Sequence, residues 1–440
     1  MTKIAQDKVA ILRLPPRIIP RQEHNISHDN ISDNVLKVLY RLKKAGFQAY
    51  LVGGSVRDLL LGREPKDFDV VTNARPEQVR ELFRNGRLIG QRFKLVHVRF
   101  RGETIEVSTF RAAHHVSDIE GEGHIVDGRI VRDNVYGLID DDVFRRDLTV
   151  NAMFYDIEDF SVIDYVGGLN DILAGRIRLI GDPEQRYIED PVRILRVVRF
   201  ATKLGFRIDE CTEKPIFTFA HLLKDISPAR LFEEVLKLFM CGCAAQTFEQ
   251  LRHYNLFAQL FPQTEKVLEE QEDGFPHTLL IHALENTDDR LAANKPVTPG
   301  FLIAALLWAP MQSIVRENMR NGLSETEAYY LAGDVVISRQ IASTTLPRRF
   351  TKVARDIWQI QPHLKRNVVK QAQRLYVHPR FRAAYDFLLL RAQAGEDVQT
   401  MADWWIKFQD DPENLAGTKL LNTVPQRRHR RRRKKKQSQQ

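Results

Sequence analysis

The sequence predicts an α+β protein, with a small mixed-sheet head followed by an all-α neck and body and a disordered basic C-terminal tail. Short alternating segments typical of strands occur up to about residue 168 and nearly vanish beyond it. Amphipathic helical patterns separated by short polar turns continue to about residue 410. The stretch RRHRRRRKKK at 427–436 has no apolar side chain to bury, so it cannot fold alone.

The chain has 440 residues, which is enough for a substantial core but too many for one compact domain. The change of pattern along the chain predicts an ordered series of parts. These are an N-terminal arm at 1–34, a mixed-sheet head at 35–170, a helical neck at 171–260, a helical body at 261–412 and the tail at 413–440.

The formal net charge of +9 comes from the tail, because 427–436 holds nine Lys and Arg residues and no acid. Such a tail attracts polyanions without sequence preference. Three cysteines, Cys211, Cys241 and Cys243, are too few for a disulfide framework, so we expect reduced thiols. No run of eighteen apolar residues and no leader-like segment occurs in the sequence. We therefore expect a cytoplasmic location without integral membrane association.

The sequence YLVGGSVRDLLLG at 50–62 combines a strand end, a glycine turn and a short helix. Gly53, Gly54 and Ser55 are typical of a turn that lets backbone N–H groups approach a ligand. The helix that follows presents N–H groups at its positive end, where a phosphate binds well. Arg57 is placed to add a positive charge there. Taken alone, a Gly-Gly pair is usually only a turn.

A second predicted strand, DFDVV at 67–71, follows a turn containing Pro65. Successive side chains of a strand alternate between faces, so Asp67 and Asp69 project to one side, about 7 Å apart at the Cα level, and Phe68 enters the core. Two carboxylates on one face repel each other unless a hard divalent cation such as Mg²⁺ lies between them. Asp67 and Asp69 are therefore candidate metal ligands, although a solvated strand edge gives the same pattern.

In combination, the glycine turn, the helix and the two acids resemble the nucleotidyltransferase superfamily. The likeness is to class II, the branch of bacterial poly(A) polymerases and CCA-adding enzymes, whose signature is Gly-Gly-x-Val-Arg-Asp followed by Asp-x-Asp, and it covers roughly 35–260. The resemblance implies a nucleotidyltransferase head with a two-metal Mg²⁺ site. A metal pair roughly 3.5–4 Å apart lowers the pKa of the attacking hydroxyl and neutralises the leaving pyrophosphate.

The third acid of the family has two candidates in this sequence. The predicted strand at 103–111 places Ile105 and Val107 on one face and Glu106 on the other. If this strand lies beside the Asp-x-Asp strand, Glu106 completes a three-carboxylate cluster. The pattern alone fits a solvated residue equally well, and the resemblance favours the catalytic acid. Asp147 is the competing candidate, and the sequence leaves the choice open.

The stretch RRDLTVN at 145–151 resembles the Arg-Arg-Asp motif of the same family. The resemblance implies that Arg146 holds phosphate. It also implies that Asp147 and Asn151, predicted on one helical face, reach the ribose. A surface ion pair is the alternative interpretation.

The stretch YIEDPVRILRVVRF at 187–200 is predicted to be one helix with Pro191 in its first turn. Asp190, Arg193 and Arg196 form a row of an acceptor and donors along it. Such an Asp/Arg pair matches the adjacent donor and acceptor of adenine or cytosine and rejects guanine and uracil. The Glu-Asp-x-x-Arg motif of the resembling family implies the same base-reading role. An intrahelical salt bridge is the alternative.

Glycine-rich polar residues from His114 to Asn134 predict a mobile loop over the site. His114, His115 and His124 lie in this loop, and no Cys or carboxylate is spaced to join them as metal ligands. We therefore expect ordinary loop histidines.

Two features favour the polymerases over the CCA-adding enzymes. LIGQRFKLVHV at 88–98 resembles the poly(A) polymerase signature, although it departs from it at Gln91. The basic tail suits an enzyme that holds varied RNA ends. The resemblance then implies template-independent transfer of AMP from ATP to RNA 3′-hydroxyls, with the neck reading the base and the neck and body binding RNA.

The implied partners are ATP and the 3′ ends of mRNA and of regulatory and stable RNA fragments, with RNA-decay proteins as further candidates. A CCA-adding tRNA nucleotidyltransferase is the alternative enzyme. A catalytically inactive RNA-binding adaptor is the alternative of a different class, against which the intact acids argue.

Overall fold

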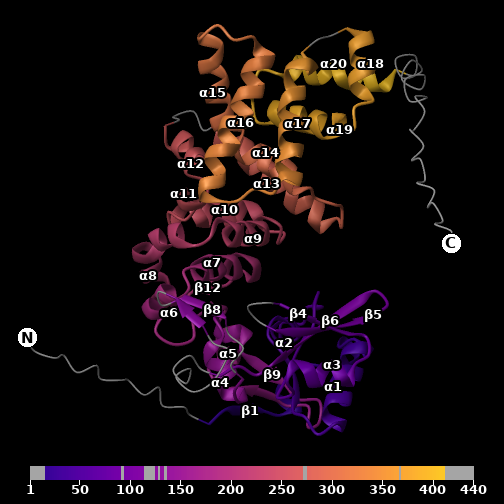
Figure 1. The fold of residues 1–440 in the computed structure, drawn as a ribbon, viewed down its shortest axis with the longest axis vertical. Helices are drawn as coiled ribbons and strands as arrows, with labels where there is room; N and C mark the ends of the chain where they lie inside the picture. Colours follow the sequence, from indigo (N-terminus) through magenta and orange to yellow (C-terminus); the bar gives the residue numbers. More distant parts are fainter. Residues whose placement is uncertain are drawn as a thin grey trace, which may run out of the picture. The chain divides into compact units, whose positions relative to one another are not determined.

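The computed structural model describes residues 15–90, 94–112, 124–126, 129–132, 136–270, 275–365 and 368–411. The chain forms two compact units (Figure 1). The first contains the residues up to 227 together with 246–259, and the second contains 228–245 together with the residues from 260 onward. The described strands all lie in the first unit, and the described part of the second contains helices only. The predicted α+β class is therefore confirmed, while the tail at 413–440 lies outside the described residues.

The head is built on an eight-stranded mixed sheet with the strand order β1-β10-β9-β2-β3-β6-β5-β4. Neighbouring strands are antiparallel except β3 and β6, which run parallel. Part of the expected N-terminal arm forms edge strand β1, which buries Ile19 against the sheet. The strands are β1 (Arg17–Ile19), β2 (Ala49–Val52), β3 (Asp69–Thr72), β4 (Gly86–Ile89), β5 (Leu95–Phe100), β6 (Glu103–Thr109), β9 (Met153–Tyr155) and β10 (Val162–Asp164).

Helix α1 (Asp33–Lys44) begins where the Ser32 side chain accepts a hydrogen bond from the Asn34 N–H. Its buried side chains recur at helical spacing and pack toward the sheet, where α3 (Pro76–Leu82) lies beside it. The other head helices are α2 (Gly54–Leu60), α4 (Ile139–Arg145) and α5 (Gly168–Leu173), with 3₁₀ turns η1 (Arg21–Glu23), η2 (His28–Asn30) and η4 (Thr149–Asn151).

Strand β3 begins at Asp69, whereas the sequence predicts a start at Asp67. Its antiparallel partner β2 ends at Val52, which is in register with Asp69, and the chain then turns into α2 at Gly53. On the β2 side, Asp67 and Phe68 therefore have no partner in the ladder, so the strand begins only at Asp69. Phe68, expected in the core, is consequently only half-buried.

The predicted loop at 114–134 contains a short hairpin of β7 (His124–Val126) and β8 (Arg129–Arg132). His124 therefore begins a strand, because cross-strand pairing orders this part of the backbone. Three other residues singled out in the sequence lie outside the described residues: Gln91, His114 and His115.

The helix predicted over 187–200 is in fact two helices, α6 (Pro183–Glu189) and α7 (Val192–Leu204). Asp190 between them has an extended backbone with φ −151° and ψ 90°. Pro191 explains the break, because a proline ring disfavours helical geometry in the residue before it. The same unit contains paired β11 (Arg176–Ile177) and β12 (Arg207–Ile208), α8 (Glu210–Phe219) and η5 (Ala220–Asp225).

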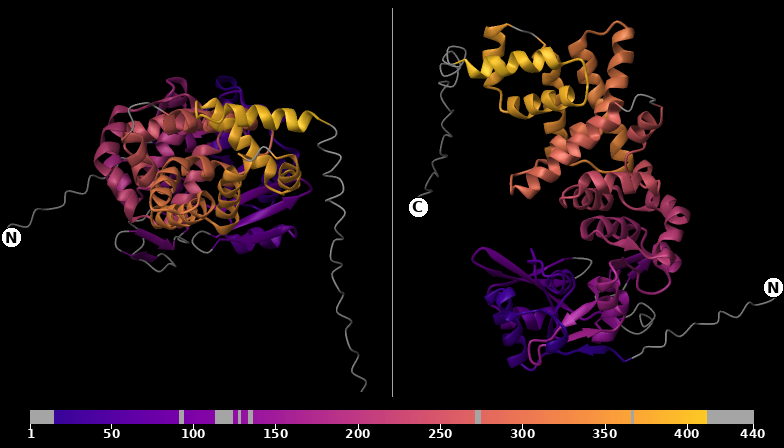
Figure 2. Two further views of the ribbon diagram at one scale, coloured as in Figure 1. Left: turned by 90° about the horizontal axis from the view of Figure 1, so that it is seen from above. Right: turned by 180° about the vertical axis from the view of Figure 1, so that it is seen from behind.

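Figure 2 shows the helices of the second unit, and buried apolar side chains of α17 to α20 form a core cluster within it. Trp308, Trp358 and Trp405 are buried in it. Among the helices that the structure describes, none combines the length and hydrophobicity that crossing a membrane requires. The remaining helices are α9 (Pro228–Phe239), α10 (Ala244–His253), α11 (Phe257–Leu260), α12 (Pro262–Glu269), α13 (Phe275–Ala292), α14 (Pro299–Leu306), α15 (Trp308–Arg320), α16 (Glu325–Ser343), α17 (Arg348–Leu364), α18 (Val369–Tyr376), α19 (Phe381–Gln393) and α20 (Gln399–Asp410).

Candidate active site

Three neighbouring strands place titratable side chains in one row across the sheet. Asp69 of β3 is in register with Glu106 of β6, and Glu106 is in register with His97 of β5. The His97 Nε2 and Glu106 Oε1 atoms are 3.0 Å apart. Ile105 and Val107 are buried on the opposite face of β6. The strand of Glu106 therefore lies directly beside that of Asp69, as a three-carboxylate arrangement requires.

The electrostatics of Asp69 reveal a concentration of negative charge. Burial, together with the charges of Glu106 and Asp67, raises the pKa of Asp69 to about 6, and Arg146 opposes this rise. Asp67 itself is exposed, just before the strand. The structure thus brings Asp67 and Glu106 within electrostatic range of Asp69, and Arg146 is the cation that partly compensates the charge of Asp69.

The glycine turn lies against this acid. Gly53 has φ +79°, which L-side chains rarely adopt, and a Cβ placed on it would lie 3.8 Å from Asp69 Oδ2 and 3.7 Å from Arg146 Nη1. No packed side chain therefore separates the turn from the carboxylate. Ser55, predicted to belong to the turn whose backbone approaches a ligand, is buried, and its Oγ donates a hydrogen bond to the Val52 carbonyl at 3.0 Å.

Arg146 is held firmly beside the turn. Its Nε and Nη2 donate to Asp142 Oδ2 at 3.0 and 2.8 Å, and its Nη1 donates to the Asn151 carbonyl at 3.4 Å. The guanidinium also lies over the Phe154 ring, with its central carbon 5.3 Å from the ring centroid. A positive charge is therefore fixed at the place where the sequence predicted a phosphate contact.

Arg57 is buried, with 2% of its surface exposed, and does not face solvent at the turn. Its Nε and Nη2 donate to Asp58 Oδ1, its Nη1 donates to Asn151 Oδ1, and it lies over the Phe200 ring. A Cβ on Gly54 would lie 3.4 Å from Arg57 Nη2. Arg57 and Asn151 therefore pair with each other, where the sequence predicted separate contacts to phosphate and ribose.

Asp147 and Asn151 do not share a helical face, because α4 ends at Arg145 and only the short turn η4 follows. Asp147 is buried and pairs with Arg196, with Oδ2 2.6 Å from Nε. Burial alone would raise the pKa of Asp147, but Arg196 and the Leu148 N–H outweigh it, and the pKa is lowered. Asp147 therefore neighbours α7, whereas Glu106 neighbours Asp69.

The predicted base-reading row is divided by the break between α6 and α7. Arg193 is buried, and its Nη1 donates to Glu189 Oε2 at 2.8 Å and to the Arg186 carbonyl at 2.7 Å. Asp190 is half-buried, and its Oδ1 accepts a hydrogen bond from the Val192 N–H at 3.3 Å. Of the three residues, only Arg193 and Arg196 therefore share a helix, and Asp190 lies two residues before the first residue of α7.

Sequence reasoning missed three partners of these residues: His97, Asp142 and Glu189. The hairpin turn at Gly102 could have placed His97 opposite Glu106, since both lie at matching distances from the turn. Asp142 and Glu189 stand four residues before the arginines they bind, which is the helical i,i+4 spacing.

The donor set fits Mg²⁺, which prefers carboxylate and phosphate oxygens. The raised pKa of Asp69 indicates negative charge that a cation would relieve. Within the described ranges, no group of three or more His, Cys, Asp or Glu side chains forms a ready-made metal cage. Mg²⁺ usually binds through one or two carboxylates together with substrate phosphates, so this donor set suits an ion that arrives with a nucleotide.

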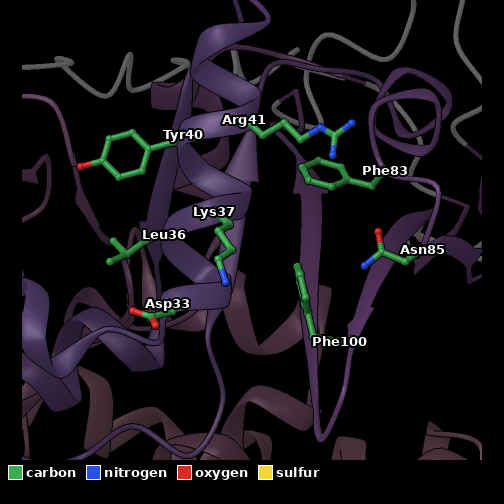
Figure 3. A pocket seen from close by; sticks show the side chains of 8 residues that line it. All are labelled: Asp33, Leu36, Lys37, Tyr40, Arg41, Phe83, Asn85 and Phe100. Atoms are coloured by element: carbon green, nitrogen blue, oxygen red, sulfur yellow. The ribbon is translucent and has the colours of Figure 1, made fainter.

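Figure 3 shows a groove of about 610 Å³ whose lining includes none of these acids. It is lined by α1 residues, including Arg41 above the Phe83 ring, and by Phe100. Side chains two residues apart on a strand lie on the same face, so Phe100 lies on the same face of β5 as buried Val98. His97 lies on the opposite face of β5, where it contacts Glu106. The groove therefore belongs to the other face of the sheet, and we do not assign it to the candidate active site.

Three protein-family models match the chain: "Poly A polymerase head domain" at 49–178, "Probable RNA and SrmB- binding site of polymerase A" at 205–268 and "Polymerase A arginine-rich C-terminus" at 321–439. Poly(A) polymerase I of Salmonella typhimurium is 49% identical over 405 residues, covering 91% of this chain and 87% of the relative. The chain belongs to the poly(A) polymerase I family. Poly(A) polymerase I of Haemophilus influenzae is 45% identical over 405 residues, covering 90% of this chain and 89% of the relative.

CCA-adding enzymes share the fold with this poly(A) polymerase I family member. The enzyme of Lactobacillus helveticus is 39% identical over 227 residues, covering 51% of this chain and 55% of the relative. The crystal structure of the Bacillus stearothermophilus CCA-adding enzyme in complex with CTP has a TM-score of 0.56 and 26% identity, covering 85% of this chain and 81% of that one. Sequence likeness to these CCA-adding relatives is thus shorter and weaker than likeness to poly(A) polymerase I.

Proposed function

We propose that this chain extends RNA 3′ ends without a template, transferring AMP from ATP to the terminal 3′-hydroxyl and releasing pyrophosphate. The observation that carries the proposal is the cluster of Asp67, Asp69 and Glu106 beside the turn at Gly53, in a chain related to poly(A) polymerase I over 91% of its length. The cluster supplies the acids that nucleotidyl transfer needs, and the relationship indicates the nucleotide and the acceptor.

The triphosphate of ATP is proposed to bind between the glycine turn and Arg146. The backbone of Gly53 and Gly54 allows close approach, and the fixed guanidinium supplies positive charge beside Asp69. The 3′-oxygen of RNA attacks the α-phosphorus, and the bond from that phosphorus to the bridging oxygen of pyrophosphate breaks.

Asp67 and Asp69, with Glu106, are proposed to hold Mg²⁺. Once bound, Mg²⁺ would acidify the attacking hydroxyl and neutralise charge on the leaving pyrophosphate. We propose Glu106 as the third acid because it is in register with Asp69, whereas Asp147 pairs with Arg196. His97 acts as a positioning residue that orients Glu106.

Asp190, Arg193 and Arg196 are proposed to read the base of ATP. A guanidinium has five N–H donors, so an arginine held by one carboxylate retains donors for a base edge. Asp147 then positions Arg196, and Glu189 positions Arg193. Such a reader selects adenine or cytosine by the donor and acceptor pattern of each base.

We propose that three buried residues support the ATP site from the protein interior: Ser55, Arg57 and Asn151. Ser55 joins the start of α2 to the end of β2, and Arg57 joins α2 to η4. These contacts fix the direction of the glycine turn, and through it the approach of the nucleotide.

RNA is proposed to bind along the neck at 171–260 and the body at 261–412, with the basic tail at 413–440 adding nonspecific attraction. The family model named for RNA binding matches 205–268, which supports this assignment. The 3′ ends of mRNA and of regulatory and stable RNA fragments are the proposed substrates, and RNA-decay proteins are proposed partners. We also propose a cytoplasmic location.

A primer-extension assay tests the proposal. A labelled RNA that lacks a CCA end is incubated with the chain, Mg²⁺ and each nucleoside triphosphate separately, and then with ATP and CTP together. We expect long tails from ATP alone. Products that stop after addition of CCA would instead identify the alternative, a CCA-adding enzyme, whose fold the chain shares.

The inactive-adaptor alternative is tested by Asp69→Ala in the same assay. The enzyme hypothesis predicts loss of AMP transfer with RNA binding retained in a filter-binding measurement. An adaptor would show no AMP transfer even in the unchanged chain, so the two hypotheses give different results before any substitution is made.

A further inference from the structure

The connection between α9 and α10 brings two thiols together. Cys241, Gly242 and Cys243 lie in this connection, and the Sγ atoms of the two cysteines are 2.9 Å apart. This is closer than two non-bonded sulfur atoms normally approach. Both cysteines are half-buried, so a small reagent can reach them.

Both ends of the connection are anchored by hydrogen bonds. The Cys241 thiol donates to the Leu238 carbonyl at 3.2 Å, in the last turn of α9. The first two N–H groups of α10 donate to the Asp288 carboxylate at 2.7 and 3.2 Å. Gly242 between them has φ +87° and is exposed, so the backbone turns sharply without a side chain in the way. The fold therefore holds the two thiols in proximity.

We propose that Cys241 and Cys243 form an intramolecular dithiol site that is oxidised to a disulfide by low-molecular-weight disulfides such as oxidised glutathione. One protein thiolate attacks a glutathione sulfur, which gives a mixed disulfide and releases one glutathione thiolate. The second protein thiol loses its proton and attacks the mixed disulfide at the protein sulfur, which releases the second glutathione. Two protein thiols are oxidised, and one small disulfide is reduced to two thiols.

Proximity distinguishes this site from the remaining cysteine. Attack by the second protein thiol on the mixed disulfide takes place within one chain and is therefore unimolecular. It should consume the mixed disulfide before the mixed disulfide accumulates. Cys211 is exposed on α8 and is the third of only three cysteines in the sequence, so closure of the pair leaves it without a partner in its own chain. Cys211 therefore serves as a matched control. The proposal does not depend on the function proposed above.

The test uses the full chain in buffers of defined reduced-to-oxidised glutathione ratio. After acid quenching, thiols are counted under denaturing conditions and the tryptic peptide at 238–252, which contains both Cys241 and Cys243, is weighed. We expect this peptide to lose two hydrogen atoms without a glutathione adduct. Cys211→Ser should leave that change intact, whereas Cys241→Ser and Cys243→Ser should each abolish it and accumulate the mixed disulfide.

A second measurement needs no variant. Phenylarsine oxide bridges two close thiols, so the reduced chain should bind one equivalent at the 238–252 peptide, and both thiols of that peptide should then be protected from alkylation. Accumulation of glutathione adducts on the unchanged peptide, or disulfide-linked dimers through Cys241 or Cys243, would overturn the proposal. Failure of phenylarsine oxide to protect both thiols would overturn it as well.

Discussion

At the scale of single residues, two aspartates of the head, half-buried Asp69 and buried Asp147, have opposite electrostatic environments. Burial, Glu106 and Asp67 raise the pKa of Asp69 to about 6. Burial also acts on Asp147, but Arg196 and backbone N–H groups lower the pKa of Asp147 overall. Asp69 therefore carries a charge that the protein alone does not satisfy, whereas the charge of Asp147 is satisfied within the fold. This difference suits Asp69 for binding a cation and Asp147 for positioning Arg196.

Asp69→Asn is expected to stabilise the metal-free chain at pH 8. An acid whose pKa is raised on folding reduces stability as pH rises from its ordinary pKa to the raised one, and stability stays reduced above it. For Asp69 this window runs from about 4 to about 6, and the gain at pH 8 is roughly 2–3 kcal/mol. Denaturant unfolding in a chelator at pH 8 and pH 4 measures this gain, most of which should be absent at pH 4 because folded Asp69 is then protonated.

The same variant should lose AMP transfer in the primer-extension assay. Mg²⁺ should raise the unfolding midpoint of the unchanged chain at pH 8 and should leave that of Asp69→Asn in place. Equal stability of the two proteins at pH 8, together with an equal response to Mg²⁺, would contradict the proposed role of Asp69.

Gly53→Ala is expected to reduce AMP transfer by about 100-fold, because displacement of reacting groups by an ångström has effects of that size. The positive φ makes the substitution strained, and the added methyl group would lie between Asp69 and Arg146. Gly46→Ala is the matched control, since Gly46 has φ +86° and nothing within 4 Å of an added Cβ. Both variants should lose about 1–3 kcal/mol of stability, measured by denaturant unfolding. Equal activity of the two would refute the role of the turn.

At the scale of elements, α7 is connected to the head by one charged and one aromatic side chain, four residues apart. Arg196 binds Asp147, which follows α4, and Phe200 lies beneath Arg57 of α2. These contacts join the predicted base-reading helix to the predicted phosphate site within the first unit. The relative placement of two sequence motifs thus depends on a few pairs between elements.

Asp147→Asn is expected to destabilise the chain at pH 7 by about 2 kcal/mol, less than for a fully buried pair because 41% of the Arg196 side chain is exposed. The pKa of Asp147 is lowered, so its contribution is present above its ordinary pKa and is lost as pH falls below it. Denaturant unfolding at pH 7 and in acid measures the change. Glu210→Gln, in the exposed pair with Lys214, is the control and should change little. An equal effect of both substitutions would argue against a positioning role for Asp147.

At the scale of the whole molecule, the candidate catalytic residues and the excess positive charge lie in different parts of the chain. The acid row and glycine turn lie in the first compact unit, and the described part of the second unit is helical throughout. The nine Lys and Arg residues at 427–436 account for the net charge of +9. We therefore expect removal of the tail to affect RNA affinity rather than the chemical step.

A chain ended at residue 411 is expected to bind RNA with a shallower salt dependence. If the tail neutralises about six phosphates, its removal reduces the slope of log affinity against log salt by about 5. The rate at saturating RNA should stay unchanged. Filter binding from low to moderate salt measures the slope, with a tail in which the basic residues are replaced by Ser and Gln as the length-matched control. An unchanged slope would show that the tail does not contact RNA.

Much of the head could be predicted from local pattern. The apolar spacing from Val35 to Leu42 indicated α1, and the alternation around Ile105 placed Glu106 on the correct face. Asp190 was placed wrongly inside a helix, although Pro191 already carried the signal for a break. Asp67 was placed in a strand that starts two residues later, because the length of a strand depends on where its partner ends.

The sequence by itself determined the fold class, the family and the residue types of the site, because periodicity, turn glycines and motif spacing are local properties of the chain. Only the tertiary structure decided which charged groups are neighbours. It placed Glu106 beside both Asp69 and His97, directed Arg57 inward to Asn151, and paired Asp147 with Arg196. Strand register and the packing of α7 set these pairs, and both depend on contacts between residues far apart in the chain.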